Sequence, residues 1–267
     1  MSNVHLYQIA YSPESLAQIE PGYQILNNLE NPRPDWYEYW PIRKFLLEEK
    51  MDENSFYGFF SPKFRNKTNL SFLETEQFVK EKAATADIMI FSPQFDMGGF
   101  FINIFEQGET FDHGFKDAFQ KFLNEVGWPV SLDQLVMDSS QIVFSNYFVA
   151  KPAFWREWHE IANALFMIAE DQSHPLSAAL RFKTTYPGQV ERKVFMQERL
   201  ASLHLSLNKE RRVAVKNPLT MAWSALPTNQ FVREAVISDA LKRSYNMTGF
   251  PEYLAVFDHI RKSVFHS

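Results

Sequence analysis

The chain has 267 residues, of which 45% are hydrophobic, 22% are charged and none is cysteine. This composition excludes a disordered chain, a disulfide scaffold, a thiolate metal site and a cysteine nucleophile. The net charge of −5 argues against generic binding to a nucleic-acid backbone, so we expect no nucleic-acid partner. Aromatic residues make up 16% of the chain, which indicates a thick core and favours a site with flat apolar walls.

Short apolar strands and longer amphipathic helices alternate along the first two thirds of the chain. In chain order, the predicted strands are Val4–Ala10, Phe56–Phe60, Asp87–Phe91 and Gln141–Val149. The predicted helices are Trp36–Glu49, Phe72–Ala84, Phe115–Val126, Ala153–Glu170, Gln189–Leu207 and Gln230–Ser244. This alternation predicts an α/β fold with a mainly parallel sheet. We expect Val4–Ala10 to be central in that sheet and Trp36–Glu49 to pack against it.

The helical pattern dominates after residue 170, which divides the chain into an α/β region (1–170) and a mostly helical region (171–267). No linker rich in glycine or serine separates them, so we expect one domain. The first residues, MSNVHLYQIAYSPES, lack the basic and apolar segments of a secretory signal. No apolar run approaches the roughly 20 residues that span a bilayer. We expect a cytoplasmic protein without a transmembrane segment; a peripheral membrane contact through exposed aromatic residues stays open.

The common catalytic signatures GxGxxG, GxxxxGK[ST], GxSxG and HExxH are absent from the sequence. This argues against a dinucleotide-dependent dehydrogenase and a P-loop NTPase. No two of the seven histidines stand four residues apart, so a histidine zinc site would need long-range assembly. Function must therefore be sought in less regular groups of residues.

Ligands of open α/β sheets bind beyond the carboxyl ends of the strands. The polar residues that follow or end the predicted strands include Tyr11, Ser61, Lys63 and Asn146. Ser61 and Lys63 offer a hydroxyl and an ammonium group to a phosphate. An amide inside an apolar run is costly to bury without a partner, so Asn146 is either an anchor of the sheet edge or a ligand contact.

The aromatic segment NPRPDWYEYWPIR ends in Arg43. Aromatic rings beside an arginine can stack a base while the guanidinium group holds a phosphate. In the alternative interpretation the rings pack on the sheet and Arg43 pairs with Glu38 or Asp35. For a binding role, we expect Arg43 and Lys63 to point into one cleft with Ser61 and to share an anion.

The order of these segments resembles that of bacterial glycosyltransferases of the GT-A-like class, which build capsular polysaccharide and lipopolysaccharide O-chains. The resemblance is carried by an aromatic helix with YEYWPIRKFL, the strands GFFSPKF, DIMIFSP and NYFVAKPAFW, and a helix with ERL, over roughly residues 4–207. It implies a Rossmann-like, three-layer GT-A-type domain with a helical carboxyl-terminal part. The implied partners are a nucleotide-sugar donor and a saccharide acceptor.

The resemblance implies displacement at the anomeric carbon, with a carboxylate that takes the proton of the acceptor hydroxyl. Glu198, in the ERL segment, and Asp138 are the candidate bases. On Gln189–Leu207, Glu198 points away from the apolar stripe, which predicts a solvated side chain paired with Arg199 or Arg192. The resemblance favours a cleft instead. Tyr11, Arg43, Ser61, Lys63 and Asn146 are the candidate nucleotide-sugar contacts.

One feature departs from the GT-A pattern. Such enzymes usually hold a divalent cation, Mn²⁺ or Mg²⁺, with an Asp-x-Asp segment, and none occurs here. The missing Asp-x-Asp segment leaves three alternatives. Lysine and arginine side chains could replace the cation, a single carboxylate such as Asp96 could hold it, or the protein transfers no sugar. The alternative function is a non-catalytic sugar- or nucleotide-binding protein or scaffold with a transferase-like fold, and a hydrolase or unrelated α/β enzyme also stays open.

Overall fold

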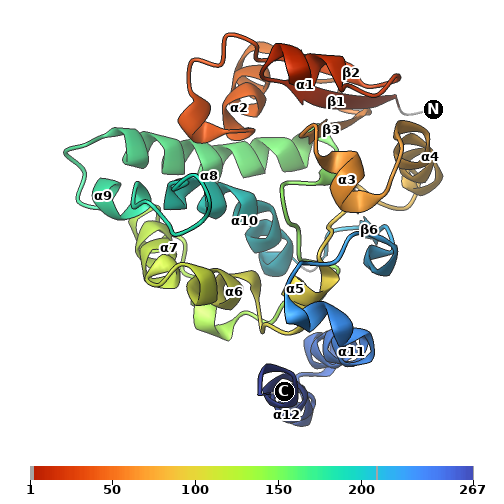
Figure 1. Ribbon diagram of the computed structural model, residues 1–267, viewed down its shortest axis with the longest axis vertical. Coiled ribbons are helices and arrows are strands. Elements are labelled where there is room, and N and C mark those ends of the chain that lie inside the picture. Colours follow the sequence, from red (N-terminus) through yellow and green to blue (C-terminus); the bar gives the residue numbers. More distant parts are fainter. Residues whose placement is uncertain (1–2, 209, 267) are drawn as a thin grey trace.

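The computed structural model describes residues 3–208 and 210–266, which fold around one mixed sheet (Figure 1). Its strands are β1 (Val4–Ala10), β2 (Gln24–Asn27), β3 (Phe56–Phe60), β4 (Ile88–Ile90), β5 (Phe148–Ala150) and β6 (Val213–Val215). Their order across the sheet is β2-β1-β3-β5-β4-β6. Strand β5 is antiparallel to both of its neighbours, and the other strands run the same way. The carboxyl ends of those strands and the amino end of β5 therefore meet at one edge.

Helices connect the strands and make up most of the carboxyl-terminal half. In chain order they are α1 (Pro13–Ala17), α2 (Tyr39–Glu48), α3 (Phe64–Thr68), α4 (Phe72–Lys82), α5 (Phe95–Gly99), α6 (Ile104–Phe111), α7 (Phe115–Glu125), α8 (Pro152–Glu170), α9 (Ser177–Leu180), α10 (Arg192–Leu207), α11 (Val232–Thr248) and α12 (Pro251–Phe265). Short 3₁₀ helices are η1 (Pro34–Trp36), η2 (Leu132–Gln134), η3 (Pro218–Thr220) and η4 (Pro227–Gln230). Within the described ranges, no helix is both long and apolar enough to cross a bilayer.

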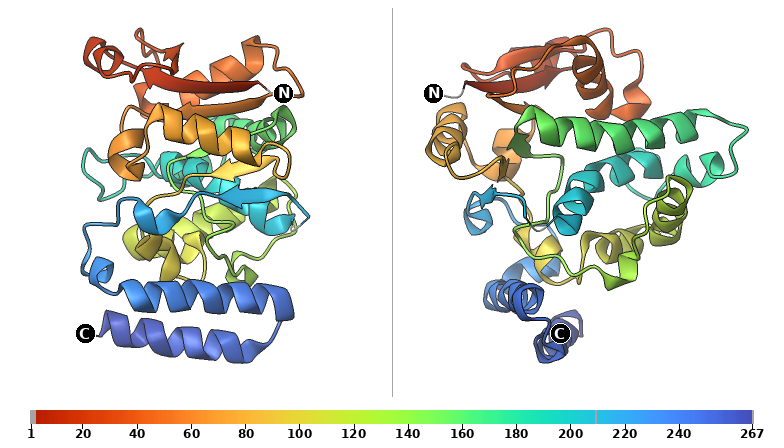
Figure 2. Two further views of the ribbon diagram at one scale, coloured as in Figure 1. Left: turned by 90° about the vertical axis from the view of Figure 1, so that its right-hand side faces the viewer. Right: turned by 180° about the vertical axis from the view of Figure 1, so that it is seen from behind.

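Helices cover both faces of the sheet, which gives three layers (Figure 2). Side chains of α2, α8 and α10 pack on one face, and side chains of α3 and α4 pack on the other. In β3, Tyr57 and Phe59 point to the first face, whereas Phe56 and Phe60 point to the second. Burial on both faces explains why the inner strands β3, β4 and β5 are apolar runs. The predicted α/β class with a mainly parallel sheet is confirmed, and the arrangement is consistent with a Rossmann-like fold.

Helix α10 lies in the interior, against α8, α6 and α9. Its buried residues are distributed around the helix and extend along almost its whole length. A helix that is buried all round belongs to the core, so its polar residues need partners within the protein. Through α10 and β6, the described residues after 170 share the core and the sheet of those before it.

Helices α11 and α12 form a hairpin at one end of the molecule (Figures 1 and 2). The hairpin is attached through α11, which packs on α5. The buried ammonium group of Lys242 donates to the carbonyl oxygens of Gly98 at 2.6 Å and Phe101 at 2.9 Å. Burial lowers the pKa of Lys242 to about 8. The two carbonyls belong to the carboxyl end of α5, where a cation is favourable.

Two of the predicted elements differ from the structure in a way that matters for the site. The run Gln141–Val149 was expected to be a strand, but β5 contains only its last two residues and Ala150. The φ angles of Ser145 and Asn146 are 58° and 53°, which a strand cannot contain. The predicted helix Trp36–Glu49 begins only at Tyr39, because Tyr37 has φ 46°.

The position of β1 also differs from the expectation. Val4–Ala10 forms a strand with the predicted bounds, and α2 packs on it through the rings of Phe45 and Tyr7. The strand lies between β2 and β3, however, one place from the edge instead of at the centre. The short strands β2 and β6 and the helix α12 were not predicted, since the first two are too short to show a period.

A buried ion pair joins α10 to the connection between α6 and α7. The guanidinium group of Arg192 donates to the carboxylate of Asp112 at 2.6 and 2.8 Å, and both side chains are about nine-tenths buried. Replacing Arg192 by Leu should lower the free energy of unfolding by about 3–5 kcal/mol, because it leaves a buried carboxylate unpaired. Urea denaturation measures this change.

The exposed pair Lys121–Asp117 on α7 is the control for this prediction. Lys121→Ala should cost less than about 1 kcal/mol, as expected for a solvated pair. The double variant Arg192→Leu/Asp112→Leu should recover much of the lost stability, since neither charge remains. Equal losses for the buried and the exposed pair would contradict the prediction.

Candidate functional site

Polar side chains from distant parts of the chain gather at the sheet edge where the parallel strands end. We call them the strand-end cluster, which consists of Glu38, Ser61, Lys67, Asn146, Tyr147 and Glu198. They are supplied by the start of α2, the end of β3, α3, the turn before β5, and α10. The fold thus brings the ends of strands together with a residue of the central helix α10.

A hydrogen bond links the end of β3 to the start of β5. The hydroxyl groups of Ser61 and Tyr147 are 2.6 Å apart, and both side chains are buried. Burial raises the pKa of Tyr147 far above its usual range, so its phenol remains neutral at ordinary pH. A neutral hydroxyl pair can rotate to donate to or accept from a bound molecule.

The turn before β5 has a strained backbone. Ser145 and Asn146 both have left-handed φ angles, a conformation that costs of order 1–3 kcal/mol at a non-glycine residue and often occurs at functional sites. The ammonium group of Lys67 donates to Ser145 Oγ at 2.9 Å. The buried amide oxygen Oδ1 of Asn146 has no hydrogen-bond partner among the described residues. Such an oxygen is costly unless a ligand donates to it.

Glu198 lies on α10, half-buried, and its carboxylate has no hydrogen-bond donor or ion-pair partner within residues 3–208 and 210–266. Burial raises the pKa of Glu198. The charges of Lys67 and Arg199 oppose this shift, whereas the carboxylate of Glu38 adds to it. A desolvated carboxyl group with a raised pKa and no partner is suited to proton transfer. The expectation of a solvated Glu198 paired with arginine was wrong, because both faces of α10 are covered.

The second carboxylate, Glu38, is positioned by the segment that precedes it. Asp35 in η1 accepts hydrogen bonds from Arg33 at 2.9 and 3.0 Å and from the fully buried Lys193 of α10 at 2.7 Å. Burial alone would raise the pKa of Asp35, but these hydrogen bonds lower it to about 2. The ion pairs fasten η1 to α10. The left-handed Tyr37 then turns the chain into α2, at whose start Glu38 lies.

Arg43 does not lie with the strand-end cluster. Its Nε donates to the side-chain oxygen of Asn163 on α8 at 2.9 Å, and its guanidinium group lies over the ring of Phe166. It pairs with neither Glu38 nor Asp35. The expected cleft shared by Arg43, Ser61 and Lys63 is therefore wrong: Arg43 faces α8 because it belongs to the packed side of α2.

The other two residues expected after the strands lie at the surface. Lys63 caps α3, is exposed, and its ammonium group has no partner in the described part of the chain. Tyr11 follows β1 and is 40% exposed; its backbone N–H donates to Ser15 Oγ at 2.9 Å. The lysine that reaches the cluster is Lys67, one helical turn after Lys63.

The surroundings of Asp138 are those of a carboxylate that stabilises a turn and not those of a catalytic base. Its carboxylate accepts hydrogen bonds from the N–H and hydroxyl of Ser140 at 2.8 and 2.6 Å and from Asn246 at 3.0 Å. Burial favours the protonated form, but these bonds prevail and lower the pKa of Asp138. A carboxylate with a lowered pKa and filled acceptor positions is a poor proton acceptor. This expectation is corrected: Asp138 fastens its turn to α11.

The residues present do not fit a cation site built by the protein. Asp96, the carboxylate expected to hold Mn²⁺ or Mg²⁺, is fully buried and accepts hydrogen bonds from Ser224 and Thr228. Its oxygens are thus occupied by donors. Across the described residues, no group of three histidine, aspartate or glutamate side chains could bind a metal ion.

Sequence reasoning found Ser61, Asn146 and Glu198 but missed Lys67, Tyr147 and the role of Glu38. Lys67 stands four residues after Lys63, which was the available signal, since two such residues lie on one face of a helix. Tyr147 directly follows the asparagine that was singled out. No sequence pattern shows that Glu38, 160 residues before Glu198, lies near it. No protein-family model, curated protein or solved structure matches the chain.

Replacing Glu198 by Gln should stabilise the protein at neutral pH. Because the pKa of Glu198 is higher in the folded than in the unfolded protein, binding of a proton to Glu198 stabilises the folded state. This stabilisation is fully present below the unfolded-state pKa and is lost as the pH rises through the folded-state pKa. The Gln variant has no charge to bury, so its Tm should exceed that of the wild type at pH 7, and the difference should shrink toward pH 4.

Differential scanning calorimetry across this pH range measures the effect. Glu53→Gln is the matched control, since Glu53 is exposed and pairs with Arg156. Its pKa is lowered by that hydrogen bond, so its replacement should not raise the Tm. A Glu198→Gln variant less stable than the wild type at pH 7 would show that the carboxylate is stabilised as an anion.

Proposed function

We propose that this protein transfers a sugar from a nucleotide-activated donor to a saccharide acceptor. The observation that carries the proposal is Glu198, a half-buried carboxyl group without a partner among the described residues, near enough to Lys67 for that charge to act on it, at the edge where the parallel strands end. This edge is the usual ligand position in open α/β sheets. A base and a cation within reach of one ligand are what displacement of a diphosphate by a hydroxyl group requires.

In the proposed reaction the acceptor hydroxyl oxygen bonds to the anomeric carbon, and the bond from that carbon to the phosphate oxygen breaks. The carboxylate of Glu198 accepts the hydroxyl proton, which makes the oxygen a stronger nucleophile. Its raised pKa improves it as a base near neutral pH. Glu38 raises that pKa further and so supports the same role.

The departing nucleoside diphosphate carries the developing negative charge. The Lys67 ammonium group, which already lies at Ser145 Oγ, is positioned to stabilise it. The hydroxyl groups of Ser61 and Tyr147 add neutral donors beside it. The amide oxygen of Asn146, which no described residue pairs, suits a hydroxyl or N–H group of the donor sugar or nucleoside. These residues carry the leaving-group role expected of Arg43 and Lys63.

Nucleotide binding tests the cationic part of the site. Isothermal titration calorimetry with UDP, GDP and dTDP should find a ligand, and Lys67→Ala should weaken its binding by about 1.5–3 kcal/mol, the range of a charge-assisted hydrogen bond. Lys63→Ala, on the same helix but exposed, should leave the affinity unchanged. The proposal fails if none of the three nucleotides binds.

Turnover tests the base. With UDP-, GDP- and dTDP-sugars as donors and methyl glycosides as acceptors, Glu198→Gln should lower kcat by roughly 100-fold or more, as loss of a general base does. Nucleotide affinity should stay unchanged. In the wild type, kcat should fall as the pH drops through the raised pKa of Glu198, because the base becomes protonated.

Glu53→Gln is the control, and it should keep full activity. A fully active Glu198→Gln variant would disprove the role of Glu198. If the wild type binds nucleotides but releases no diphosphate from any donor, the non-catalytic binding protein replaces the transferase.

A further inference from the structure

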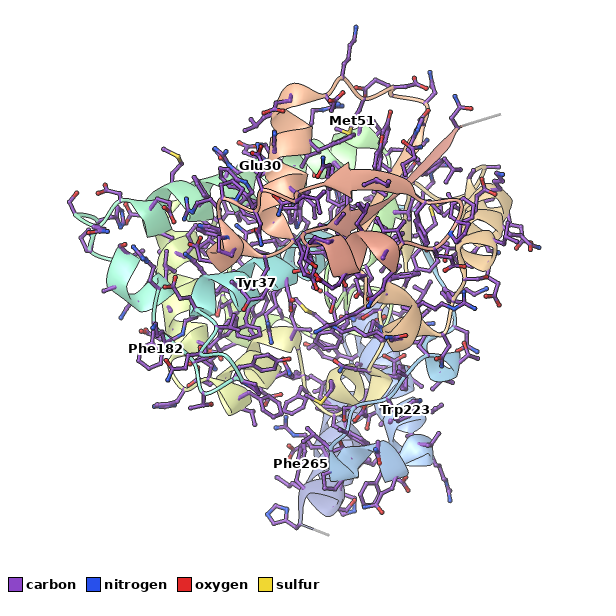
Figure 3. All side chains as sticks on the ribbon, turned by 45° about the horizontal axis from the view of Figure 1, so that its top comes forward. Glu30, Tyr37, Met51, Phe182, Trp223 and Phe265 are labelled. Atoms are coloured by element: carbon purple, nitrogen blue, oxygen red, sulfur yellow. The ribbon has the colours of Figure 1, made fainter. Side chains whose placement is uncertain are left out.

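Two exposed tyrosines lie near the segments that carry Glu38 and Glu198, the two carboxylates of the strand-end cluster. Tyr37, which is 46% exposed, directly precedes Glu38, and Figure 3 shows it on the connection into α2. Tyr186 is 58% exposed and lies in the loop before α10. Two exposed rings beside half-buried carboxylates offer apolar surface next to polar groups, which is the combination that a ligand site requires.

The exposed position of Tyr37 requires a strained backbone conformation. Its backbone has φ 46° and ψ −130°, a rare conformation for a bulky residue. Rigid neighbours impose this conformation, since Trp36 is buried and donates through its indole N–H to Glu170 at 2.9 Å. The strain presents the ring to solvent instead of to the core, in contrast with Tyr39, which is buried.

Tyr186 stands at the tip of a fastened loop. At the base of the loop, the N–H and hydroxyl of Thr184 donate to the carbonyl oxygen of Val190 at 3.0 and 2.8 Å. The Tyr186 ring packs edge-on against Phe195 of α10, with the ring centroids 5.3 Å apart. Phe195 is three residues before Glu198, so the two lie on one side of the helix. The contact fixes Tyr186 near the candidate base.

The two tyrosines are also near each other. Both are linked to the start of α10: Tyr37 follows Asp35 by two residues, and Asp35 accepts a hydrogen bond from Lys193 at 2.7 Å, while Tyr186 packs on Phe195, two residues after Lys193. Tyr37 precedes one carboxylate in sequence, and Tyr186 reaches the helix of the other through Phe195. Each ring is therefore held beside a segment that carries one of the two carboxylates, Tyr37 beside Glu38 and Tyr186 beside the turn of α10 that carries Glu198.

We propose that Tyr37 and Tyr186 form the platform that binds the saccharide acceptor, with the C–H face of a pyranose ring against the aromatic rings and one hydroxyl group directed to Glu198. This inference rests on the proposed transferase function. A pyranose has an apolar C–H face and a polar rim, and tyrosine offers an apolar ring with a hydroxyl at its edge. A nucleotide diphosphate would instead avoid the two neighbouring carboxylates and bind toward Lys67.

Saturation-transfer-difference NMR tests the platform directly. The probes are methyl β-D-glucopyranoside, methyl β-D-galactopyranoside and methyl α-L-rhamnopyranoside, each measured with the wild-type protein with and without UDP, GDP or dTDP. We expect signals from the C–H protons of at least one probe. Tyr37→Ala and Tyr186→Ala should abolish them, whereas Tyr37→Phe and Tyr186→Phe, which keep the ring, should retain them.

Phe250→Ala is the matched control, because Phe250 is also exposed, at 59%, but lies at the start of α12. It should leave the signals unchanged. Retained signals in both tyrosine-to-alanine variants, or no signal from any probe with the wild type, would overturn the platform. Retention of the fold in the variants is checked by their Tm.

Kinetics separates this inference from the proposed function. In the transfer assay, Tyr37→Ala should raise the acceptor KM by about tenfold while the donor KM stays unchanged. A change in the donor KM alone would overturn the acceptor assignment. If no nucleotide binds but a probe gives signals that depend on both rings, the transferase proposal is wrong and the saccharide platform stands.

Discussion

The burial of α10 on all sides is the constraint on which the rest of the structure depends. A core helix with many polar residues is stable only if each finds a partner, and α10 draws those partners from distant segments. Arg192 binds Asp112 and Lys193 binds Asp35, while Arg199 donates to the carbonyl oxygen of Ile104 at 3.0 Å. The helix thereby fixes η1, α6 and the connection to α7 around itself. Glu198 differs from these three residues, since it has no such partner in the described structure.

Glu198 connects the core to the candidate site. The ion pairs of Lys193 hold the segment that carries Tyr37 and Glu38, and the ring of Phe195 supports Tyr186. The helix α10 therefore supplies the candidate base and also orients the segment with Tyr37 and Glu38 and the loop with Tyr186. The rest of the site is built by strand ends, where the Ser61–Tyr147 hydrogen bond and Lys67 stabilise the strained turn before β5. The rigid core thus keeps two strained segments, around Tyr37 and Asn146, in conformations that they would not adopt alone.

The differences between expectation and structure have one physical origin. Periodicity reports which face of an element is apolar, and it predicted the longer elements well, as β1 and α8 illustrate. It cannot report how many sides of a helix are covered, so Glu198 was expected in solvent. It also cannot distinguish a strand from an apolar turn, and Ser145 and Asn146 therefore went unnoticed as left-handed residues. Arg43 was expected to bind a phosphate because aromatic residues surround it in the sequence. In the fold, aromatic rings are instead its packing partners.

The sequence by itself determined the α/β class, the bounds of β1 and β3, most of the long helices, and the choice of Ser61, Asn146 and Glu198 for attention. These follow from local patterns, because residues two, three or four apart meet on one face of an element. Only the tertiary structure decided that Lys67 and not Lys63 reaches the strand-end cluster, that Asp138 and Arg43 lie elsewhere, and that Glu38 lies near Glu198. Those outcomes depend on how segments distant in the sequence pack, and the choice of partner is then set by the buried ion pairs, hydrogen bonds and aromatic contacts of the assembled core.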